Sequence, residues 1–390
     1  MPMRRSALMT RDAKGGVPAL FSGRRVTYSY STRVAIRRAC DLLGLVPGDE
    51  VLAPAYHCGS ELDPLLHAGL QVRLYATGQN TVIDPAEVAA RITRRTRALY
   101  LIHYFGFLQP ATAALRALCD ARGLVLIEDC ALSLLSGSNP VEDGMGGQIG
   151  GRAGDVALFC FYKFFPTLGG GALVLNTDRI TGDARFTRRA PIGLAGKPLV
   201  RAGLDLALGA ERRMALMRRL KPRPAAAPDM GTRPKAGMGT QPEADMPSDY
   251  YFDPRLQDTA LSTVTARQIA SFDIQAAITL RRRNYSLYQA EMASLPTLSP
   301  LFPDLPPEVC PLLFPVLTDN RDALAYALVQ RGIAATPWWA GYHRSLDFTG
   351  QTTARFLKDH VLALPCHQYL EPDAIRHICQ VLRDLTGNRL

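Results

Sequence analysis

The sequence predicts an α/β protein with a mostly parallel sheet in its larger domain and a smaller α+β unit near its C-terminal end. Short apolar runs alternate with segments of helical periodicity from residue 32 to about residue 178, which is the pattern of a parallel sheet with helices on both faces. The 390 residues are 47% hydrophobic and 21% charged, which is enough for two domains with separate cores.

Capping residues mark several helices that are expected in the larger domain. Ser31 precedes the first periodic segment, Asp84 precedes Pro85 at the start of the third, and Gly123 closes the fourth. We expect helices over 31–45, 61–70, 84–93 and 111–123, and strands over 47–56, 71–76, 97–106, 123–131, 157–162 and 171–177.

The remainder of the chain predicts an insertion and then a second unit. Residues 222–247 are rich in Pro, Gly, Ala and Met without periodicity, which is typical of a linker. One long helix is expected over 262–295, then a strand over 310–318 and helices over 321–333 and 371–385. The predicted divisions are an arm (1–19), the large domain (20–185), a basic segment with linker (186–248) and the small domain (249–390).

The net charge of +10 is concentrated in one segment. Residues 185–223 hold eleven Lys or Arg and two acidic residues, so the rest of the chain is nearly neutral and a nucleic-acid partner is not indicated. Three interpretations of the segment stay open: a solvated helix pair, a site for an anionic substrate, or peripheral contact with an anionic membrane. We expect a cytoplasmic protein, because the N-terminal residues lack an apolar signal segment and the eight cysteines form no C-x-x-C pair that would suggest a metal site.

Two titratable residues stand where solvated side chains are not expected. Asp129 ends the apolar strand GLVLIEDCA, and the carboxyl ends of parallel strands are where such sheets bind ligands. Lys163 lies among four phenylalanines and a tyrosine, just before Gly169–Gly171. A desolvated lysine has a lowered pKa and can form an imine, although a strand-end lysine can also extend to solvent.

A third feature is the helix start at Ser31, Thr32 and Arg33. Free backbone N–H groups and the helix dipole favour an anion there, although Ser31 and Thr32 could serve only as caps. An amine, a carboxylate and an anion site are what pyridoxal 5'-phosphate requires for its aldehyde, its pyridine nitrogen and its phosphate. The sequence therefore predicts this cofactor, with Lys163 and Asp129 as the catalytic residues.

Nearly the whole chain also resembles the DegT/StrS-type aminotransferases. The similar blocks are PGDEVLAPAYHCGSELDPLLHAGLQVRLY, VLIEDCA, GGRAGDVALFCFYKFFPTLGGGALVLNTD and VLALPCHQYL. The resemblance implies the aspartate-aminotransferase fold (fold type I) with a seven-stranded sheet, and a homodimer with its active site at the subunit boundary. It also implies transfer of an amino group from glutamate to a nucleotide-linked keto-sugar.

The resemblance implies roles for individual residues as well. Lys163 matches the Schiff-base lysine and Asp129 the partner of the pyridine nitrogen, while Ser31, Thr32 and Arg33 match the phosphate site. Tyr56 and His57 lie in the loop whose aromatic residue stacks on the cofactor ring, unless that position is Cys58. Cys160 stands where the family has a phosphate-binding Ser, and Leu132 where it usually has Gln. These departures keep open two alternatives: a catalytically silent or divergent homologue that acts as a binding or scaffold protein, and a pyridoxal-phosphate enzyme that acts on a different substrate.

Overall fold

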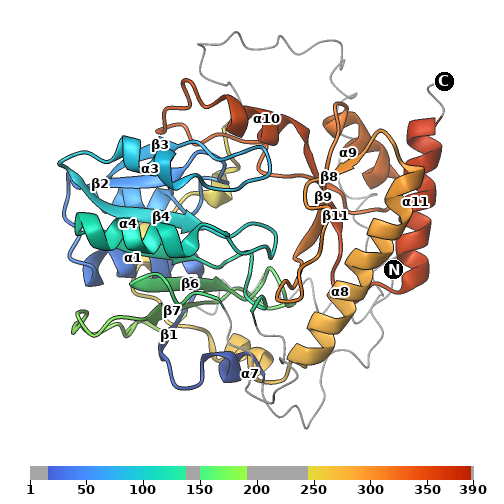
Figure 1. The fold of residues 1–390 in the computed structure, drawn as a ribbon. Coiled ribbons are helices and arrows are strands. Elements are labelled where there is room, and N and C mark those ends of the chain that lie inside the picture. The colour runs from blue at the N-terminus through green and yellow to red at the C-terminus, as the bar shows by residue number, and fades with distance from the viewer. Residues whose placement is uncertain (1–15, 138–149, 191–244, 388–390) are drawn as a thin grey trace.

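The computed structural model describes residues 16–137, 150–190 and 245–387. Figure 1 shows an α/β unit built on the N-terminal half of the chain beside a second unit that contains the C-terminal helices. Each unit is built on its own sheet, the first within residues 25–175 and the second within residues 299–365. The predicted domain limits at residues 19, 185 and 248 stay predictions.

The first unit contains the predicted seven-stranded sheet. Its strands are β1 (Arg25–Ser29), β2 (Glu50–Pro54), β3 (Gln71–Tyr75), β4 (Thr96–Ile102), β5 (Val125–Asp129), β6 (Val156–Cys160) and β7 (Gly171–Leu175). The order is β1-β7-β6-β5-β4-β2-β3. β7 runs antiparallel to both of its neighbours, whereas all other pairs are parallel. The prediction of a mostly parallel sheet is confirmed, although β1 was not predicted from the sequence.

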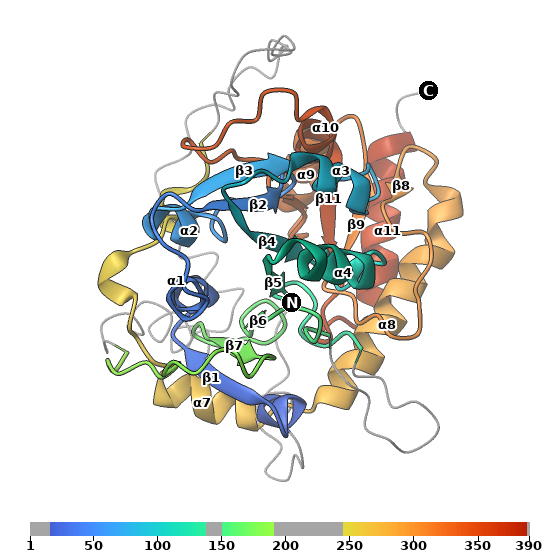
Figure 2. The ribbon, with the colours of Figure 1, turned by 60° about the vertical axis from the view of Figure 1, so that its left-hand side comes forward.

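Four helices cover the two faces of this sheet. They are α1 (Thr32–Leu42), α2 (Asp63–His67), α3 (Pro85–Arg91) and α4 (Thr112–Arg122). Figure 2 shows α1 and α2 on one face and α3 and α4 on the other. The predicted caps are confirmed: Ser31 Oγ accepts a hydrogen bond from the N–H of Val34 at 3.4 Å, and Asp84 Oδ1 accepts one from the N–H of Ala86 at 2.9 Å. Gly123 ends α4 with a φ of +64°.

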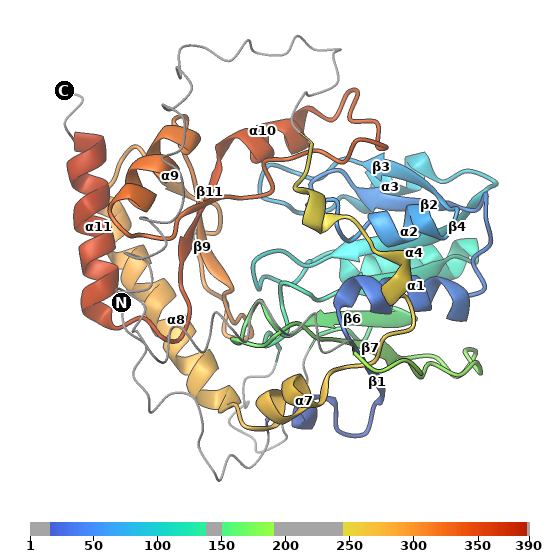
Figure 3. The ribbon, with the colours of Figure 1, turned by 180° about the vertical axis from the view of Figure 1, so that it is seen from behind.

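The second unit is a four-stranded antiparallel sheet with helices. Its elements are α8 (Ile274–Glu291), β8 (Ser299–Pro300), β9 (Leu313–Leu317), α9 (Arg321–Gln330), β10 (Thr336–Pro337), α10 (Thr352–His360), β11 (Val361–Pro365) and α11 (Pro372–Gly387). Helix α7 (Thr263–Ala270) precedes them and contacts residues 17–21 of the first unit. The strand order is β10-β11-β9-β8. Helices α8 and α11 pack together at the outer side of this unit (Figure 3).

The prediction of one long helix over 262–295 is wrong, because two helices occupy this stretch. The break lies at Ser271–Asp273, where Asp273 Oδ1 accepts a hydrogen bond from the N–H of Ala276 and caps α8. Phe272 is buried at the break and stacks on Phe165, with ring centroids 4.4 Å apart. A capping side chain and an aromatic anchor therefore outweigh the helical periodicity of the sequence.

Most of the basic segment 185–223 lies outside the described residues, since the structure describes only 185–190 of it. The three interpretations of that segment therefore stay predictions. Within the part of the chain that is described, no helix is both long and apolar enough to cross a membrane.

Gly106 is a point where the two units meet closely. Its φ is +102°, and a Cβ at this position would lie 2.2 Å from the backbone oxygen of Cys310. The neighbouring carbonyl of Phe105 accepts a hydrogen bond from the N–H of Leu312 at 2.8 Å. Both contacts join the end of the β4 loop to the segment that enters β9.

We expect Gly106→Ala to lower the free energy of unfolding by about 3 kcal/mol or more, because a positive φ and a backbone clash combine. Gly123→Ala is the matched control, since Gly123 also has a positive φ but has open space around its Cα. Urea unfolding of both variants measures the difference. Equal losses in the two variants would show that the contact with Cys310 is not a constraint.

Candidate active site

Asp129 is a buried carboxylate at the carboxyl end of β5. It is 4% exposed, and its Oδ2 accepts a hydrogen bond from the Tyr100 hydroxyl at 2.7 Å, while Oδ1 accepts one from the N–H of Ala131 at 2.8 Å. Burial raises the pKa of Asp129, against the lowering effects of the Lys163 charge and of these hydrogen bonds. A carboxylate has room for more than two hydrogen bonds, so Asp129 can accept another from a ligand.

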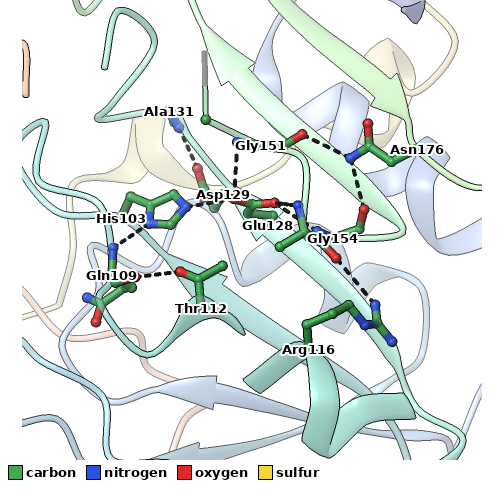
Figure 4. A network of polar contacts seen from close by, with 12 residues as sticks. His103, Gln109, Thr112, Arg116, Glu128, Asp129, Ala131, Gly151, Gly154 and Asn176 are labelled. Atoms are coloured by element: carbon green, nitrogen blue, oxygen red, sulfur yellow. Dashed lines mark hydrogen bonds and ion pairs between the residues drawn. The ribbon is translucent and has the colours of Figure 1, made fainter. Parts of the chain in front are cut away.

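The adjacent residue on β5, Glu128, points to the other face of the sheet. Its Oε1 lies 2.9 Å from His103 Nε2 and accepts a hydrogen bond from the N–H of Gly151, while Oε2 accepts bonds from the N–H groups of Ala153 and Gly154 (Figure 4). Burial raises the pKa of Glu128, but the hydrogen bond with His103 and the backbone N–H groups outweigh it, so the pKa is lowered. This network holds the loop that leads into β6.

His103 is a structural residue of this network. Its Nδ1 accepts a hydrogen bond from the N–H of Gln109 at 2.9 Å, which leaves Nε2 as the donor to Glu128. His103, Glu128 and Cys130 lie close enough together to hold a metal ion. Hydrogen bonds within the chain already account for both ring nitrogens and for the carboxylate, so we do not assign a metal site to them.

Lys163 lies on a short turn that follows β6. The N–H of Phe161 donates to the carbonyl of Gly170 at 3.1 Å, and the N–H groups of Phe164 and Phe165 donate to the carbonyl of Phe161. Lys163 is half-buried, and its neighbour Tyr162 is 54% exposed. The Lys163 residue is therefore partly open to solvent and is not enclosed in the core.

The expected lowering of the Lys163 pKa is wrong. Burial does lower it, but the acidic groups of Tyr162, Cys160, Cys58 and Asp129 outweigh burial, and the pKa of Lys163 is raised. The charges of Lys163 and Asp129 therefore interact. No direct ion pair joins these two side chains among the contacts of the described residues.

The start of α1 lies beside the turn of Lys163. Thr32 Oγ1 donates a hydrogen bond to the carbonyl of Phe159 on β6 at 3.0 Å, and the Cys160 thiol also contacts Thr32. A Cβ at Gly171 would lie 2.8 Å from the Thr32 nitrogen, so only glycine lets β7 approach the helix start this closely. The structure thus brings Ser31, Thr32 and Cys160 together with Lys163.

Arg33 has another set of partners. Its NH1 donates hydrogen bonds to the carbonyls of Asp249 at 2.7 Å and Tyr251 at 2.9 Å. It thereby ties the segment that follows the insertion to the first turn of α1. The guanidinium is engaged by backbone carbonyls, which leaves the N–H groups of the helix start as the anion donors in this region.

The three candidates for the ring-stacking position lie in the loop after β2 and have different surroundings. Tyr56 is fully buried and contacts Tyr104 and Trp339, with ring centroids 5.6 and 5.2 Å apart. The ring of His57 lies against Phe348 at 5.4 Å. These are contacts of core side chains.

Cys58 of this loop and Lys163 influence each other's pKa. Its thiol donates to Glu61 Oε2 at 2.6 Å, and its N–H donates to Glu61 Oε1 at 3.0 Å. Burial and the nearby Glu61 raise the pKa of Cys58 to about 12, so the thiol stays protonated at neutral pH. Glu61 could not be identified from the sequence, because its contact with Cys58 depends on the turn that folds it back.

The donor set of this site fits pyridoxal phosphate. An amine and a buried carboxylate with spare acceptor capacity lie close enough to influence each other's pKa, and the start of α1, with its free N–H groups, lies beside the turn that carries the amine. Residues 25–217 and 250–383 match the model of the DegT/DnrJ/EryC1/StrS aminotransferase family. The chain belongs to this family. The fold-type-I architecture predicted from the sequence is therefore confirmed.

Curated relatives in the DegT/DnrJ/EryC1/StrS family include sugar aminotransferases. GDP-perosamine synthase of Vibrio cholerae is 32% identical over 150 residues, which are 38% of this chain and 39% of that protein. The dTDP-3-amino-3,4,6-trideoxy-alpha-D-glucose transaminase of Streptomyces venezuelae is 33% identical over 159 residues, which are 40% of this chain and 38% of that protein. The matched part thus spans about two fifths of these relatives.

Solved structures of aminotransferases share the fold. DesV of S. venezuelae, solved in complex with a ketimine intermediate, aligns with a TM-score of 0.60 at 23% identity over 95% of this chain and 87% of that chain. A structure of ntda from Bacillus subtilis with bound cofactor PMP aligns with a TM-score of 0.62 at 17% identity, over 95% of this chain and 75% of that chain. At these identities the likeness establishes the fold alone.

We expect Glu128→Gln to lower the free energy of unfolding at neutral pH by about 2 kcal/mol, because the amide brings a donor to a site that is filled with donors. The lowered pKa of Glu128 means that its stabilising contribution is complete above its ordinary value of 4.5 and is lost as the pH falls through the lower value of the folded state. The gap between variant and wild type should therefore narrow below pH 4.5.

Chemical unfolding at several pH values measures this gap. Glu308→Gln is the control, since Glu308 is exposed and should change stability little at any pH. A gap that stays constant down to acid pH would mean that Glu128 is not held as a carboxylate.

Proposed function

We propose that this chain is a pyridoxal-phosphate-dependent aminotransferase that moves an amino group from glutamate to a keto-sugar carried on a nucleotide. The observation that carries the proposal is the arrangement of Lys163, Asp129 and the start of α1 around one face of the sheet. The family relationship supports the reaction class. The relatives named as GDP-, dTDP- and UDP-sugar enzymes support the class of acceptor.

Each residue of the site has a distinct task in this proposal. The N–H groups at Ser31–Arg33 hold the cofactor phosphate, with the Thr32 hydroxyl and the Cys160 thiol lining the same corner. Asp129 accepts a hydrogen bond from the ring nitrogen and keeps that nitrogen protonated, while the Tyr100 hydroxyl orients the carboxylate. When bound, the cofactor supplies an aldehyde for amines and a ring that accepts an electron pair.

Lys163 has two tasks in turn. Its Nζ would hold the cofactor covalently, and when not so engaged it would hold a proton at Nζ within reach of the substrate. The raised pKa of Lys163 means that its ammonium must give up a proton before the amine can attack an aldehyde. A partly exposed turn leaves Lys163 accessible to a cofactor and to an incoming amine.

The competing function is a silent homologue that binds a partner or scaffolds a complex. It rests on Leu132 and Cys160, where the family pattern predicts Gln and Ser. Leu132 is 1% exposed and belongs to the main hydrophobic core, so it contributes packing and no hydrogen bond to a ligand. Cys160 keeps a contact with Thr32, which preserves the geometry of the phosphate corner. We therefore favour the enzyme.

We expect the purified protein with added pyridoxal phosphate to show a visible absorption band, and borohydride to attach the cofactor to Lys163. Lys163→Ala should abolish the band and the label. Lys358 is the internal control: burial lowers its pKa to about 8, but its Nζ is engaged by the carbonyls of His57, Trp339 and Gly341. Peptide mapping that finds the label on Lys358, or on no lysine, would contradict the assignment.

We expect Asp129→Asn to retain the covalently bound cofactor but to lose about 10²-fold or more in kcat, because the ring nitrogen is no longer kept protonated. The half-reaction with glutamate, followed by absorbance, gives the rate. A panel of nucleotide-linked keto-sugars then tests the acceptor, since the correct one should restore the band of the covalently bound cofactor. An Asp129→Asn variant of wild-type rate would remove Asp129 from the mechanism.

A homodimer and a cytoplasmic location complete the proposal. Both rest on the resemblance and on composition, with the active site expected at the subunit boundary. Sedimentation of the purified chain at several concentrations measures the first.

A further inference from the structure

Arg281 on α8 is a buried guanidinium whose hydrogen-bond partners are all neutral. It is 1% exposed, and its Nε donates to Gln368 Oε1 at 2.7 Å. NH1 donates to the carbonyls of Pro311 at 3.1 Å and Leu312 at 2.9 Å, and NH2 donates to the carbonyl of Phe164 at 3.0 Å. Burial lowers the pKa of Arg281, since no carboxylate accompanies its charge among these partners.

One of these contacts reaches the residue next to Lys163. The carbonyl of Phe164 accepts two hydrogen bonds, from Arg281 NH2 at 3.0 Å and from Gln368 Nε2 at 2.9 Å. Arg281 and Gln368 are also bonded to each other, so the two side chains and the carbonyl form a closed triangle. The Arg281 guanidinium lies over the Phe164 ring, 4.9 Å from its centroid.

The turn that carries Lys163 needs such an anchor. Residues 161–165 belong to neither a helix nor a strand. The hydrogen bond from Phe161 to Gly170 holds the first residue of the turn, and the one from Phe165 to Phe161 joins its two ends. The carbonyl of Phe164 sets the orientation of the peptide that follows it. Holding that peptide restrains the part of the turn directly after Lys163.

Burying a charge costs free energy, so we compare the contacts of Arg281 with those of its less buried neighbour Arg282. Arg282 NH1 donates to the carbonyls of Pro306 at 2.7 Å and Val309 at 2.6 Å, and thus secures the same loop from a partly exposed position. Arg282 therefore shows that an arginine at lower burial can secure this loop. Arg281 adds the contact with Phe164. Its planar guanidinium is suited to this contact, because it can donate to several carbonyls at once.

We propose that Arg281 and Gln368 are positioning residues that set the orientation of Lys163 from the C-terminal unit. The inference rests on the proposed function, since it gives Lys163 a reaction to be positioned for. The two residues lie 117 and 204 positions from Phe164 in the sequence. The reactive amine of the first unit is thereby oriented by the second unit, and packing of the two units is a condition for a productive lysine.

Gln368→Glu is the sharpest variant for the test. A glutamate keeps the oxygen that accepts from Arg281 Nε and adds a charge partner for the guanidinium, but it has no donor for the carbonyl of Phe164. Arg281→Lys and Arg281→Met remove the planar fork with and without the charge. Arg282→Met is the matched control, because it loses two carbonyl contacts on the same loop and none with Phe164.

The readouts are the melting temperature of each protein, the rate at which pyridoxal phosphate becomes covalently attached to Lys163, and kcat separately from KM. We expect Gln368→Glu to fold, to attach the cofactor about tenfold more slowly and to lose kcat at an unchanged KM. A misoriented amine slows the reaction but leaves substrate binding unchanged. Arg281→Lys should lie between wild type and Arg281→Met. Arg282→Met should attach the cofactor at the wild-type rate.

Two outcomes overturn the inference. Attachment at the wild-type rate in Gln368→Glu and Arg281→Lys would make the triangle a packing feature, and slowing in Arg282→Met equal to that in Gln368→Glu would make the effect one of loop stability. If Arg281→Met does not fold, Gln368→Glu still decides between these results. If the wild-type protein never attaches the cofactor, the proposed function itself is wrong. If wild type and variants attach it at the same rate, only the positioning role is wrong.

Discussion

The structure depends on one electrostatic constraint, which is a carboxylate buried at the end of a parallel strand opposite an amine. Asp129 is 4% exposed, and its pKa is raised by burial, so a cation or a donor must compensate for its charge. The Tyr100 hydroxyl and the charge of Lys163 supply part of that compensation. A protonated ring nitrogen would supply the rest, which is why the same carboxylate that is costly to bury is useful for holding this cofactor.

The sheet separates this reactive carboxylate from a structural one. Glu128 and Asp129 are adjacent on β5 and therefore lie on opposite faces. Glu128 is saturated by His103 and three backbone N–H groups, and its pKa is lowered, whereas Asp129 has two hydrogen bonds and a raised pKa. Two neighbouring acids thus receive opposite pKa shifts from their surroundings. Glu128 stabilises the loop before β6, and Asp129 keeps acceptor capacity for the cofactor that we propose.

The sequence predicted the features that are local in the chain. The helix caps at Ser31 and Asp84, the strand that ends at Asp129 and the Gly-rich entry to β7 each depend on a few consecutive residues, and each is found. The sequence also predicted that Lys163 would be reactive, but gave the wrong direction for its pKa, because acidic groups from separate segments surround it. Three adjacent candidates for one position, Tyr56 to Cys58, could not be separated since side-chain direction in a loop is not periodic.

Contacts between distant segments were not predictable from one sequence. The hydrogen bond from Tyr100 to Asp129 follows from strand register, and Arg33 turns to the segment 249–251 across the insertion. The triangle of Arg281, Gln368 and Phe164 joins three segments whose order in the chain gives no hint of proximity. The local sequence identifies Lys163 as a candidate, whereas we propose that these long-range contacts orient its amine.

The most direct test is an experimental structure of the chain with pyridoxal phosphate. We expect a covalent bond from Lys163 Nζ to the cofactor. We also expect the cofactor's ring nitrogen within hydrogen-bond distance of Asp129, and the cofactor's phosphate at the N–H groups of Thr32 and Arg33. A cofactor attached elsewhere, or a ring whose nitrogen faces away from Asp129, would contradict it.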